Sequence, residues 1–367
     1  MLPEPEPEAL AASDALLQRI RRELAAGGNW IGFARYMELA LYEPGLGYYA
    51  GGSAKLGAPG DFATAPELGT LYARTLARQV AELLQPGESI LEFGAGSGAL
   101  AEALVAELAP ESYLILETSA ELRARQQARL GKRARWLERL PEKFRGVMLA
   151  NEVADAMPVH AVAWRAGGIL ERGVSEAAGR LAWAERAAAG ELLAAARKLQ
   201  VPVPYESEIG LVARAWMKLV AARLERGAIL VVDYGFPARE FYHPQRAGGT
   251  LMCHYRHRAH GDPFFHPGLQ DITAHVDFSA LARAAREGGL EVLGYANQAQ
   301  FLVNCGITAV LGREDAADAA RYAPQAAQAH KLLSPAEMGE IFKVLAVGRG
   351  VERPLLGFAH GDRSYSL

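Results

Sequence analysis

The stretch ILEFGAGSGAL, residues 90 to 100, limits the fold of this chain more than any other segment. An apolar run ends at Leu91, an acid (Glu92) follows, and three glycines alternate with other residues before a helical pattern opens at Ala99. Glycine lets the backbone adopt positive φ and approach a ligand closely. A strand, a glycine turn and a helix in this order predict an α/β sheet that binds a nucleotide-like ligand. A glycine-rich turn in an unrelated α/β protein is the alternative.

The spacing of the glycines indicates which ligand is involved. A dinucleotide-binding loop reads G-x-G-x-x-G and holds a pyrophosphate at the N-terminus of its helix. Here Gly94, Gly96 and Gly98 are spaced G-x-G-x-G, and Glu92 stands two residues before the first of them. A carboxylate at that place opposes a pyrophosphate and suits a cation. The sulfonium and ammonium groups of S-adenosylmethionine meet this requirement, and a nicotinamide oxidoreductase is disfavoured.

Composition excludes several other classes of function. The net charge of −3 gives no electrostatic reason to expect nucleic acid or an anionic membrane as the main partner. No apolar run approaches the ~20 residues of a membrane span, so no membrane insertion is expected. The two cysteines form no C-x-x-C pair, and the acidic, proline-rich start does not resemble a secretory or transit signal. These features predict a cytoplasmic protein.

Periodicity along the chain predicts the organisation of the fold. Strand and helix patterns alternate from residue 89 to about 150 and return in a strand at 228–233 (AILVVD), which is typical of a parallel, doubly wound sheet. Between them, a β-ribbon (160–164, 169–174, 181–184) and two helices (190–199, 209–226) read as an insertion. A polar, irregular stretch at 240–275 is typical of a functional or mobile loop.

From these patterns we predict five regions. They are a disordered lead (1–12), a helical and loop region that covers the ligand cleft (13–85), a core (86–159 and 228–350), the inserted substrate or partner region (160–227) and a C-terminal tail (351–367). Within the covering region we expect a helix at 13–26, loops at 31–67 and a helix at 68–84. Within the core we expect a helix that starts at Ser334 and a strand at 341–347.

Glu117 is the predicted ribose ligand. It follows the second apolar strand (YLIL, 113–116) and lies 23 positions after Gly94. An acid at the end of the next strand, about 20 residues on, is where such folds bind ribose hydroxyls. The alternative is an acid that begins a helix, near Thr118 and Ser119, where it interacts favourably with the helix dipole.

The segment NEVADAMPV, residues 151–159, places three polar side chains where another apolar strand stops. Ligands of open α/β sheets occupy the crevice at the carboxyl ends of the strands. Asn151, Glu152 and Asp155 are therefore expected in the site, with Glu152 and Asp155 orienting the acceptor of a methyl group and directing its lone pair. The alternative is that the two acids cap the following turn.

Three further segments supply candidate residues. Asp233 closes the strand at 228–233 and either lines the same cleft or makes buried structural contacts. The stretch 249–278 holds five histidines, and His275 is taken as a candidate catalytic residue. Neither H-E-x-x-H nor paired C-x-x-C spacing is present, so no metal is expected. The loop at 57–73, with Gly60, Asp61, Phe62, Pro66 and Glu67, is placed to close over the cleft and exclude water.

The order of these motifs resembles the MidA family of class I S-adenosylmethionine-dependent methyltransferases. The matching segments lie at 36–49 (YMELALYEPGLGYY), 60–69 (GDFATAPELG), 91–101 (LEFGAGSGALA), 151–161 (NEVADAMPVHA), 231–237 (VVDYGFP), 249–264, 270–278, 298–307 and 342–350. A leucine-like residue is expected at position 154 of this pattern, where the chain has alanine. The resemblance covers residues from about 30 to 360, nearly the whole chain.

This resemblance implies a Rossmann-like, seven-stranded methyltransferase sheet with an inserted β-ribbon and helical region. It also implies protein arginine methylation, since mitochondrial members of the family assist assembly of respiratory complex I and modify one of its subunits. The expected partners are a protein substrate, with a complex I subunit as the candidate, and a second copy of the chain in a homodimer. A methyltransferase fold that binds S-adenosylmethionine without turnover and acts as an assembly chaperone is the alternative.

The predicted site residues follow from both lines of reasoning. The catalytic set is Glu152, Asp155, Asp233 and His275. The set that binds S-adenosylmethionine is Gly60, Asp61, Phe62, Pro66, Glu67, Glu92, Gly94, Ala95, Gly96, Gly98, Glu117, Thr118, Asn151 and Glu152.

Overall fold

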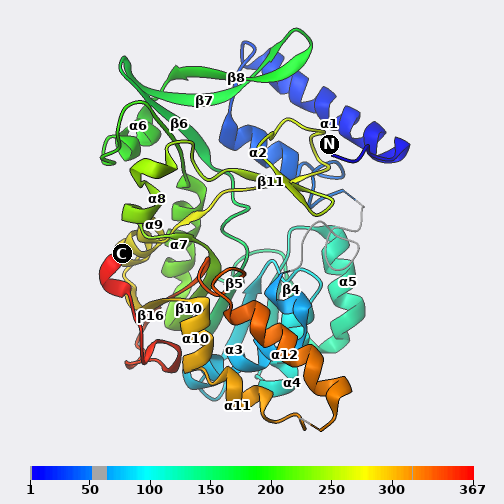
Figure 1. Ribbon diagram of the computed structural model, residues 1–367, viewed down its shortest axis with the longest axis vertical. Coiled ribbons are helices and arrows are strands. Elements are labelled where there is room, and N and C mark those ends of the chain that lie inside the picture. Colours follow the sequence, from blue (N-terminus) through cyan, green and yellow to red (C-terminus); the bar gives the residue numbers. More distant parts are fainter. Residues whose placement is uncertain (1, 52–63, 316) are drawn as a thin grey trace. The chain divides into compact units, whose positions relative to one another are not determined.

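The computed structural model describes residues 2–51, 64–315 and 317–367, which fold into two compact units (Figure 1). The first unit consists of Met1–Phe62, Asp155–Arg214 and Ala238–Asp277. The second consists of Ala63–Ala154, Ala215–Pro237 and Phe278–Leu367. The chain therefore leaves each unit and returns to it twice, and each unit is described by itself.

The second unit is built on a mixed sheet with a continuous path of seven strands. Their order is β15 (Glu291–Asn297), β16 (Phe342–Arg349), β10 (Leu224–Phe236), β5 (Phe144–Asn151), β2 (Ser89–Phe93), β3 (Tyr113–Leu116) and β4 (Arg135–Leu137). The expected seven-stranded methyltransferase sheet is thus confirmed. The prediction that all strands of the sheet run parallel was wrong for one strand, because β16 pairs antiparallel with both β10 and β15. A strand buried on both faces has the same apolar pattern in either direction.

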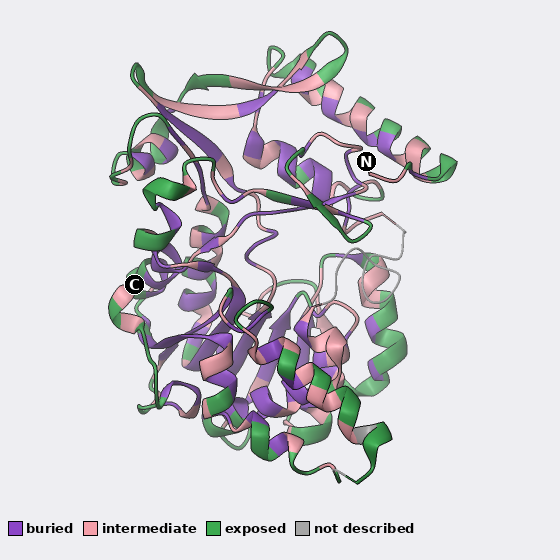
Figure 2. Cartoon of the chain, in the orientation of Figure 1, coloured by how far each residue is buried: buried purple, intermediate pink, exposed green. Residues whose placement is uncertain are grey.

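Helices cover both faces of this sheet. They are α3 (Thr70–Leu83), α4 (Ala99–Leu108), α5 (Ala120–Leu130), α9 (Phe278–Glu287), α10 (Gln298–Asn304), α11 (Ile307–Leu311) and α12 (Ala319–Leu333). Alternate strand residues such as Ile90, Val147 and Leu230 join α3, α4, α10, α11 and α12 in one buried cluster. Helix α9 contacts β10, β15 and β16 and contributes nothing to that cluster. The burial colouring in Figure 2 shows these strands buried between exposed helix surfaces.

The first unit contains two smaller sheets. One has the order β1 (Ile31–Gly32), β7 (Gly168–Ala177), β6 (His160–Arg165) and β9 (Tyr205–Ile209), with β8 (Arg180–Ala187) paired to β7, and the other has the order β12 (Arg258–His260), β11 (Met252–Tyr255) and β13 (Asp271–Thr273). The remaining helices are α1 (Pro7–Ala26), α2 (Phe33–Tyr42), α6 (Gly190–Ala196) and α8 (Ala238–Phe241). Apolar side chains of α1 and α2 pack with β6 and β7 in one core. The predicted β-ribbon is therefore present.

A few short elements complete the chain. Helix α7 (Leu211–Arg223) runs from the end of the inserted segment into β10, and β14 (Val276–Asp277) precedes α9. Five 3₁₀ turns are described: η1 (Ala65–Leu68), η2 (Gly131–Arg133), η3 (Pro244–Arg246), η4 (Leu356–Phe358) and η5 (Ser364–Ser366).

Several local expectations were wrong. Helix α1 begins at Pro7, inside the supposed disordered lead, because proline is well suited to the first turn of a helix. Helix α2 lies in the supposed loop region 31–67, and no helix begins at Ser334, where the chain forms turns. The stretch 240–275 contains three short paired strands instead of one long loop.

The division into units also differs from the five predicted regions. Helix α3, which we placed in the N-terminal covering region, belongs to the unit that holds the large sheet. Residues 238–277, which we placed in the core, belong with the N-terminal segment and the insertion. The tail packs into the sheet unit, where the rings of Phe358 and Phe301 lie 5.3 Å apart. Contacts between segments far apart in sequence decided these memberships.

Candidate cofactor site at the carboxyl edge of the sheet

Strand register brings the predicted motifs to one edge of the sheet. Phe93, at the end of β2, pairs with Leu116 of β3 and Ala150 of β5. Asn151 of β5 in turn pairs with Val232 of β10. Because these strands are parallel, the residues that follow them gather at the same edge, where open α/β sheets bind ligands.

The glycine turn has the backbone geometry expected of it. Gly94, Gly96 and Gly98 have φ values of 58°, 53° and 81°, in the left-handed region where a side chain is strained. A Cβ atom at Gly94 would also lie 3.3 Å from Val153 Cγ2. Gly98 is the N-cap of α4, and Ala95 between the glycines is buried. The turn therefore exposes backbone at the strand end, which a Cβ at these positions would obstruct.

Glu92 is buried beneath this turn. Its carboxylate accepts a hydrogen bond of 2.7 Å from the Tyr113 hydroxyl, and only 2% of the residue is exposed. Burial raises the pKa of Glu92 to about 7, and the nearby Glu117 carboxylate acts in the same direction. A cation placed close to Glu92 would favour its ionised form. The position therefore suits the positively charged ligand expected from the sequence.

Glu117 follows β3 and is half-buried. Its Oε1 accepts from the backbone N–H of Ser119 at 2.9 Å, and its Oε2 accepts from Gln126 Nε2 at 2.9 Å. Burial raises the pKa of Glu117, while these hydrogen bonds act to lower it. Ser119 is the N-cap of α5, so Glu117 also lies close to the start of a helix, as the alternative interpretation expects. The carboxylate is held in place, and each oxygen keeps lone pairs that could accept from a hydroxyl. Thr118 beside it is exposed.

Asn151 and Glu152 form a connected polar group at the end of β5. The Tyr72 hydroxyl donates to Asn151 Oδ1 at 2.5 Å, and Asn151 Nδ2 donates to Glu152 Oε1 at 3.1 Å. The backbone N–H of Ala65 also donates to Glu152 Oε1, at 3.2 Å. Two donors thus orient one carboxylate oxygen.

Glu152 has a backbone conformation that is rare for residues other than glycine. Its φ is 54°, in the left-handed region, and its N–H donates to the carbonyl of Val232 at 2.8 Å. Such strain costs of order 1–3 kcal/mol and is concentrated at functional sites. The observed outlier therefore supports a functional role for this side chain over a simple cap.

Asp233 holds the turn that carries Glu152. The residue is fully buried, Oδ2 accepts from the backbone N–H of Ala154 at 2.9 Å, and Oδ1 accepts from that of Tyr234 at 2.9 Å. We had placed Asp233 in the catalytic set. Its burial and backbone contacts favour the structural alternative, a positioning residue for the end of β5.

The segment before α3 lies against both the glycine turn and Glu152. Ala65, the first residue of η1, contacts Glu152 as described, and the Glu67 carboxylate accepts a hydrogen bond from Ser97 Oγ, between the second and third glycines. Arg129 NH1 also donates to Ser97 Oγ, at 2.7 Å. Glu67 thus contacts the glycine turn directly, and the expected binding of the cofactor by Pro66 and Glu67 stays a prediction. Gly60, Asp61 and Phe62 lie outside the described residues.

Two predicted catalytic residues, Asp155 and His275, belong to the first unit. Asp155 is 6% exposed, and its carbonyl oxygen accepts from the backbone N–H of Ala274 at 3.0 Å, one residue before His275. The His275 N–H donates to Thr250 Oγ1 at 3.1 Å. The structure thus brings these two segments together within their unit, and their contact with the acceptor stays a prediction.

The sequence reasoning missed three polar residues of the site. Tyr72, Tyr113 and Gln126 are each almost fully buried and bond to predicted site residues. A tyrosine on an apolar helix face or strand is normally interpreted as a residue of the hydrophobic core, so its sequence position gives no sign of a role in the site. The one available signal was a glutamine on the apolar side of the helix at 120–130.

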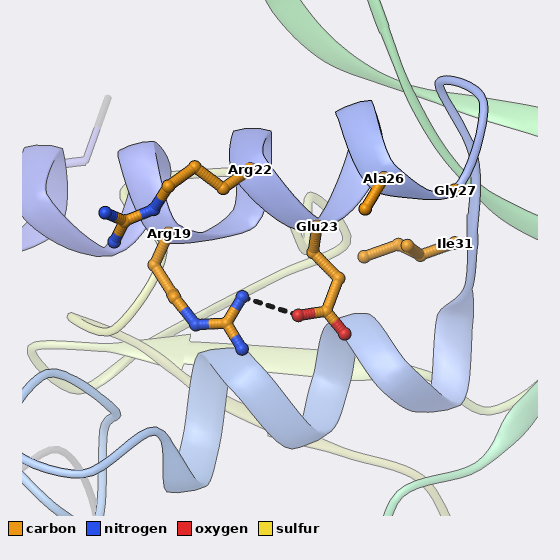
Figure 3. Close-up of a pocket in the computed structure, with 6 residues that line it drawn as sticks. All are labelled: Arg19, Arg22, Glu23, Ala26, Gly27 and Ile31. Atoms are coloured by element: carbon orange, nitrogen blue, oxygen red, sulfur yellow. Dashed lines mark hydrogen bonds and ion pairs between the residues drawn. The ribbon is translucent and has the colours of Figure 1, made fainter.

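In the described part of the chain, no group of three or more His, Cys, Asp or Glu side chains is arranged to hold a metal ion, and no helix is long and apolar enough to cross a membrane. A surface hollow of about 610 Å³ lies in the first unit. Figure 3 shows the residues that line it, among which Arg19 and Glu23 form an ion pair. Its lining comprises Arg19, Arg22, Glu23, Ala26, Gly27 and Ile31, none of which was predicted to bind a ligand.

The chemistry of the edge residues fits S-adenosylmethionine. Glu92 and Glu117 supply acceptors for ammonium and hydroxyl groups, and the glycine turn leaves room where a Cβ would intrude. Carboxylates in these positions oppose the pyrophosphate of a dinucleotide. These carboxylate acceptors therefore match a cationic, phosphate-free ligand.

Comparison with known proteins gives the same answer. Residues 71–296 match the model of a family of S-adenosyl-L-methionine-dependent methyltransferases. The mitochondrial protein arginine methyltransferase NDUFAF7 homolog of Drosophila melanogaster is 27% identical over 416 aligned positions, covering 97% of this chain and 92% of its own length. The human protein arginine methyltransferase NDUFAF7 is 28% identical, covering 86% of this chain and 79% of its own.

A crystal structure of a Burkholderia thailandensis protein bound to S-adenosylhomocysteine is similar over the full length of both chains. Its sequence is 50% identical to this chain, and the TM-score is 0.95. The expected cofactor is therefore confirmed.

Proposed function

Because the chain belongs to the MidA family of S-adenosylmethionine-dependent methyltransferases, we propose that it methylates an arginine side chain of a protein. That it is a methyltransferase follows from the family. The choice of arginine is supported by the names of the relatives and by the carboxylate at the end of β5. The observation that carries the proposal is the strained and doubly hydrogen-bonded Glu152.

The arrangement around Glu152 suits a guanidinium acceptor. S-adenosylmethionine, when bound, supplies a methyl group on a positively charged sulfur. A guanidinium nitrogen that gains this methyl must lose one proton, and its lone pair must point at the methyl carbon. A carboxylate binds a guanidinium in a fixed plane through two parallel hydrogen bonds. Glu152, oriented by Asn151 and Ala65, would hold the acceptor in this way.

The rest of the chain's contribution is positioning. Asp233 holds the backbone after Glu152, and Tyr72 sets the orientation of the Asn151 amide through its hydroxyl. The Asp233 contact is buried, and the Tyr72 contact is partly buried. An in-line displacement depends mainly on the alignment of donor and acceptor. Loss of either contact should therefore lower the rate of methyl transfer more than the affinity for the cofactor.

For the substrate, we propose a subunit of respiratory complex I, the class implied by the family resemblance, and for the assembly we propose a homodimer. The competing function is a chaperone for complex assembly that binds the cofactor without turnover. The two differ in whether Glu152 is needed for methyl transfer.

The test uses the purified full-length protein, S-adenosylmethionine, and complex I isolated from cells that lack the gene. We expect mass spectrometry to find methylated arginine on a subunit. Glu152→Gln should lose this product and retain S-adenosylhomocysteine binding by calorimetry, while Ala178→Gly, on an exposed hairpin turn of the first unit, serves as a control that retains both. Cofactor binding without methylated arginine, together with complex assembly that Glu152→Gln leaves unaffected, would support the chaperone instead.

A further inference from the structure

Gln126, on α5, is a fully buried glutamine that connects three separate parts of the cofactor edge. Its Nε2 donates to the carbonyl oxygen of Gly96 at 2.9 Å and to Glu117 Oε2 at 2.9 Å. Its Oε1 accepts from the Trp136 indole N–H, also at 2.9 Å. The three contacts satisfy both amide protons and one acceptor position of the side chain.

The partners are far apart in sequence but belong to one site. Gly96 is the central glycine of the turn after β2, Glu117 follows β3, and Trp136 lies on β4. The turn also sits directly on this side chain, since a Cβ at Gly98 would lie 3.5 Å from Gln126 Cγ. A single amide thus ties the glycine turn to the acid predicted to bind ribose.

We propose that Gln126 is a positioning residue for S-adenosylmethionine, which sets the distance between the glycine turn and the Glu117 carboxylate. The two protons on its amide nitrogen allow Gln126 to donate to Gly96 and Glu117 at the same time. Trp136 determines which way the amide faces, because its N–H can bond only to the oxygen end. Reversal of the amide would place that oxygen against a carbonyl and a carboxylate.

Charge supports the same role. The Glu117 carboxylate lies near Glu92, whose pKa it raises, and near Arg123, whose guanidinium lowers the pKa of Glu117. The hydrogen bond from Gln126 also favours the ionised form of Glu117, against its burial. A carboxylate that accepts from ribose hydroxyls has to be both ionised and correctly aimed, and Gln126 contributes to both.

The test measures S-adenosylhomocysteine binding by calorimetry, which needs no methyl acceptor and so does not depend on the proposed arginine substrate. Gln126→Glu keeps the size of the side chain but places a second carboxylate against Glu117. We expect it to weaken binding by about tenfold to a hundredfold relative to the wild type at pH 8, the range for a lost hydrogen bond to a charged group. At pH 6 the ratio should be much smaller, because two adjacent carboxylates then share a proton that can restore one bond.

Gln79→Glu is the matched control. Gln79 is also fully buried in the same unit and donates to a glutamate, Glu82, at 2.7 Å, but its other contact is the backbone N–H of Gly357 at 2.7 Å. This variant should lose thermal stability without the pH-dependent loss of ligand affinity.

Trp136→Phe provides an independent check if Gln126→Glu does not fold. It removes the donor that orients the amide, so we expect weaker binding with the wild-type pH profile. Wild-type affinity in either folded variant, or a loss in Gln126→Glu that is equal at pH 6 and pH 8, would overturn the proposal and leave Gln126 a purely structural residue.

Discussion

The backbone strain at Glu152 leads to a prediction about the sign of a stability change. Its φ of 54° lies in the left-handed region, where glycine is unstrained and other residues are penalised. Replacing Glu152 with alanine or with glycine removes the same two hydrogen bonds to Oε1. The two variants therefore differ in the backbone preference of residue 152 and in little else.

The expected size of the difference follows from that preference. At ordinary positions glycine is less stable than alanine by about 0.5–1 kcal/mol, because it loses more freedom on folding. In the left-handed region a Cβ costs roughly 1–2 kcal/mol. Glu152→Gly should therefore be more stable than Glu152→Ala by about 1 kcal/mol, which is the reverse of the usual order.

Thermal unfolding of the two variants measures this difference. For a unit of this size, 1 kcal/mol corresponds to about 2–4 °C in Tm. Ala178, on the exposed turn between β7 and β8, has a φ of 49° and supplies a control. Ala178→Gly should raise stability by a similar amount and leave methyl transfer unchanged, whereas both Glu152 variants should lose methyl transfer.

A result in which Glu152→Ala is as stable as Glu152→Gly, while Ala178→Gly stabilises as expected, would refute the reasoning. It would mean that the backbone at residue 152 relaxes freely and stores no strain, and the functional argument drawn from it would fail.

Three further predictions concern neighbouring groups. Tyr72→Phe removes the donor to Asn151 and should lower kcat several-fold or more in a steady-state methylation assay, with little change in S-adenosylhomocysteine affinity and a stability loss of about 1 kcal/mol; a wild-type kcat would contradict its positioning role. Because the pKa of Glu92 is raised to about 7, above that of an unfolded glutamate, its contribution to stability falls as pH rises from about 4.5 through 7. Glu92→Gln should therefore flatten the pH dependence of Tm over this window, and an unchanged profile would show that Glu92 does not titrate there. Asp233→Ala leaves two backbone N–H groups without their acceptor and should cost about 2–4 kcal/mol in urea unfolding, while a cost below 1 kcal/mol would show that the turn does not depend on it.

Much of the second unit was predictable because its signals are local. The strands at 89–93 and 113–116 and the helix at 120–130 correspond to apolar runs and periodic patterns within single segments. The membership of the tail and of α3, by contrast, depended on packing between distant segments. The antiparallel direction of β16 left no trace in its composition, because a strand buried on both faces is apolar whichever way it runs.

The candidate site shows the same division between local and distant information. Positive φ at Gly94, Gly96 and Gly98 and an acid after the next strand are properties of short segments, so their spacing was enough to predict a cofactor turn and a ribose ligand. Asp233 was assigned to the chemistry because it ends a strand, but its burial and its bonds to Ala154 and Tyr234 indicate a positioning role.

The sequence by itself determined the class of sheet, the glycine turn and the acids that follow the strands, since each is encoded by neighbouring residues and by the requirements of the backbone. The tertiary structure alone decided that Tyr72 bonds to Asn151 and that Gln126 joins Gly96 to Glu117. These bonds link residues of different structural elements, from 9 to 79 positions apart in the sequence. They form only where strand register and helix packing bring a donor within about 3 Å of its acceptor.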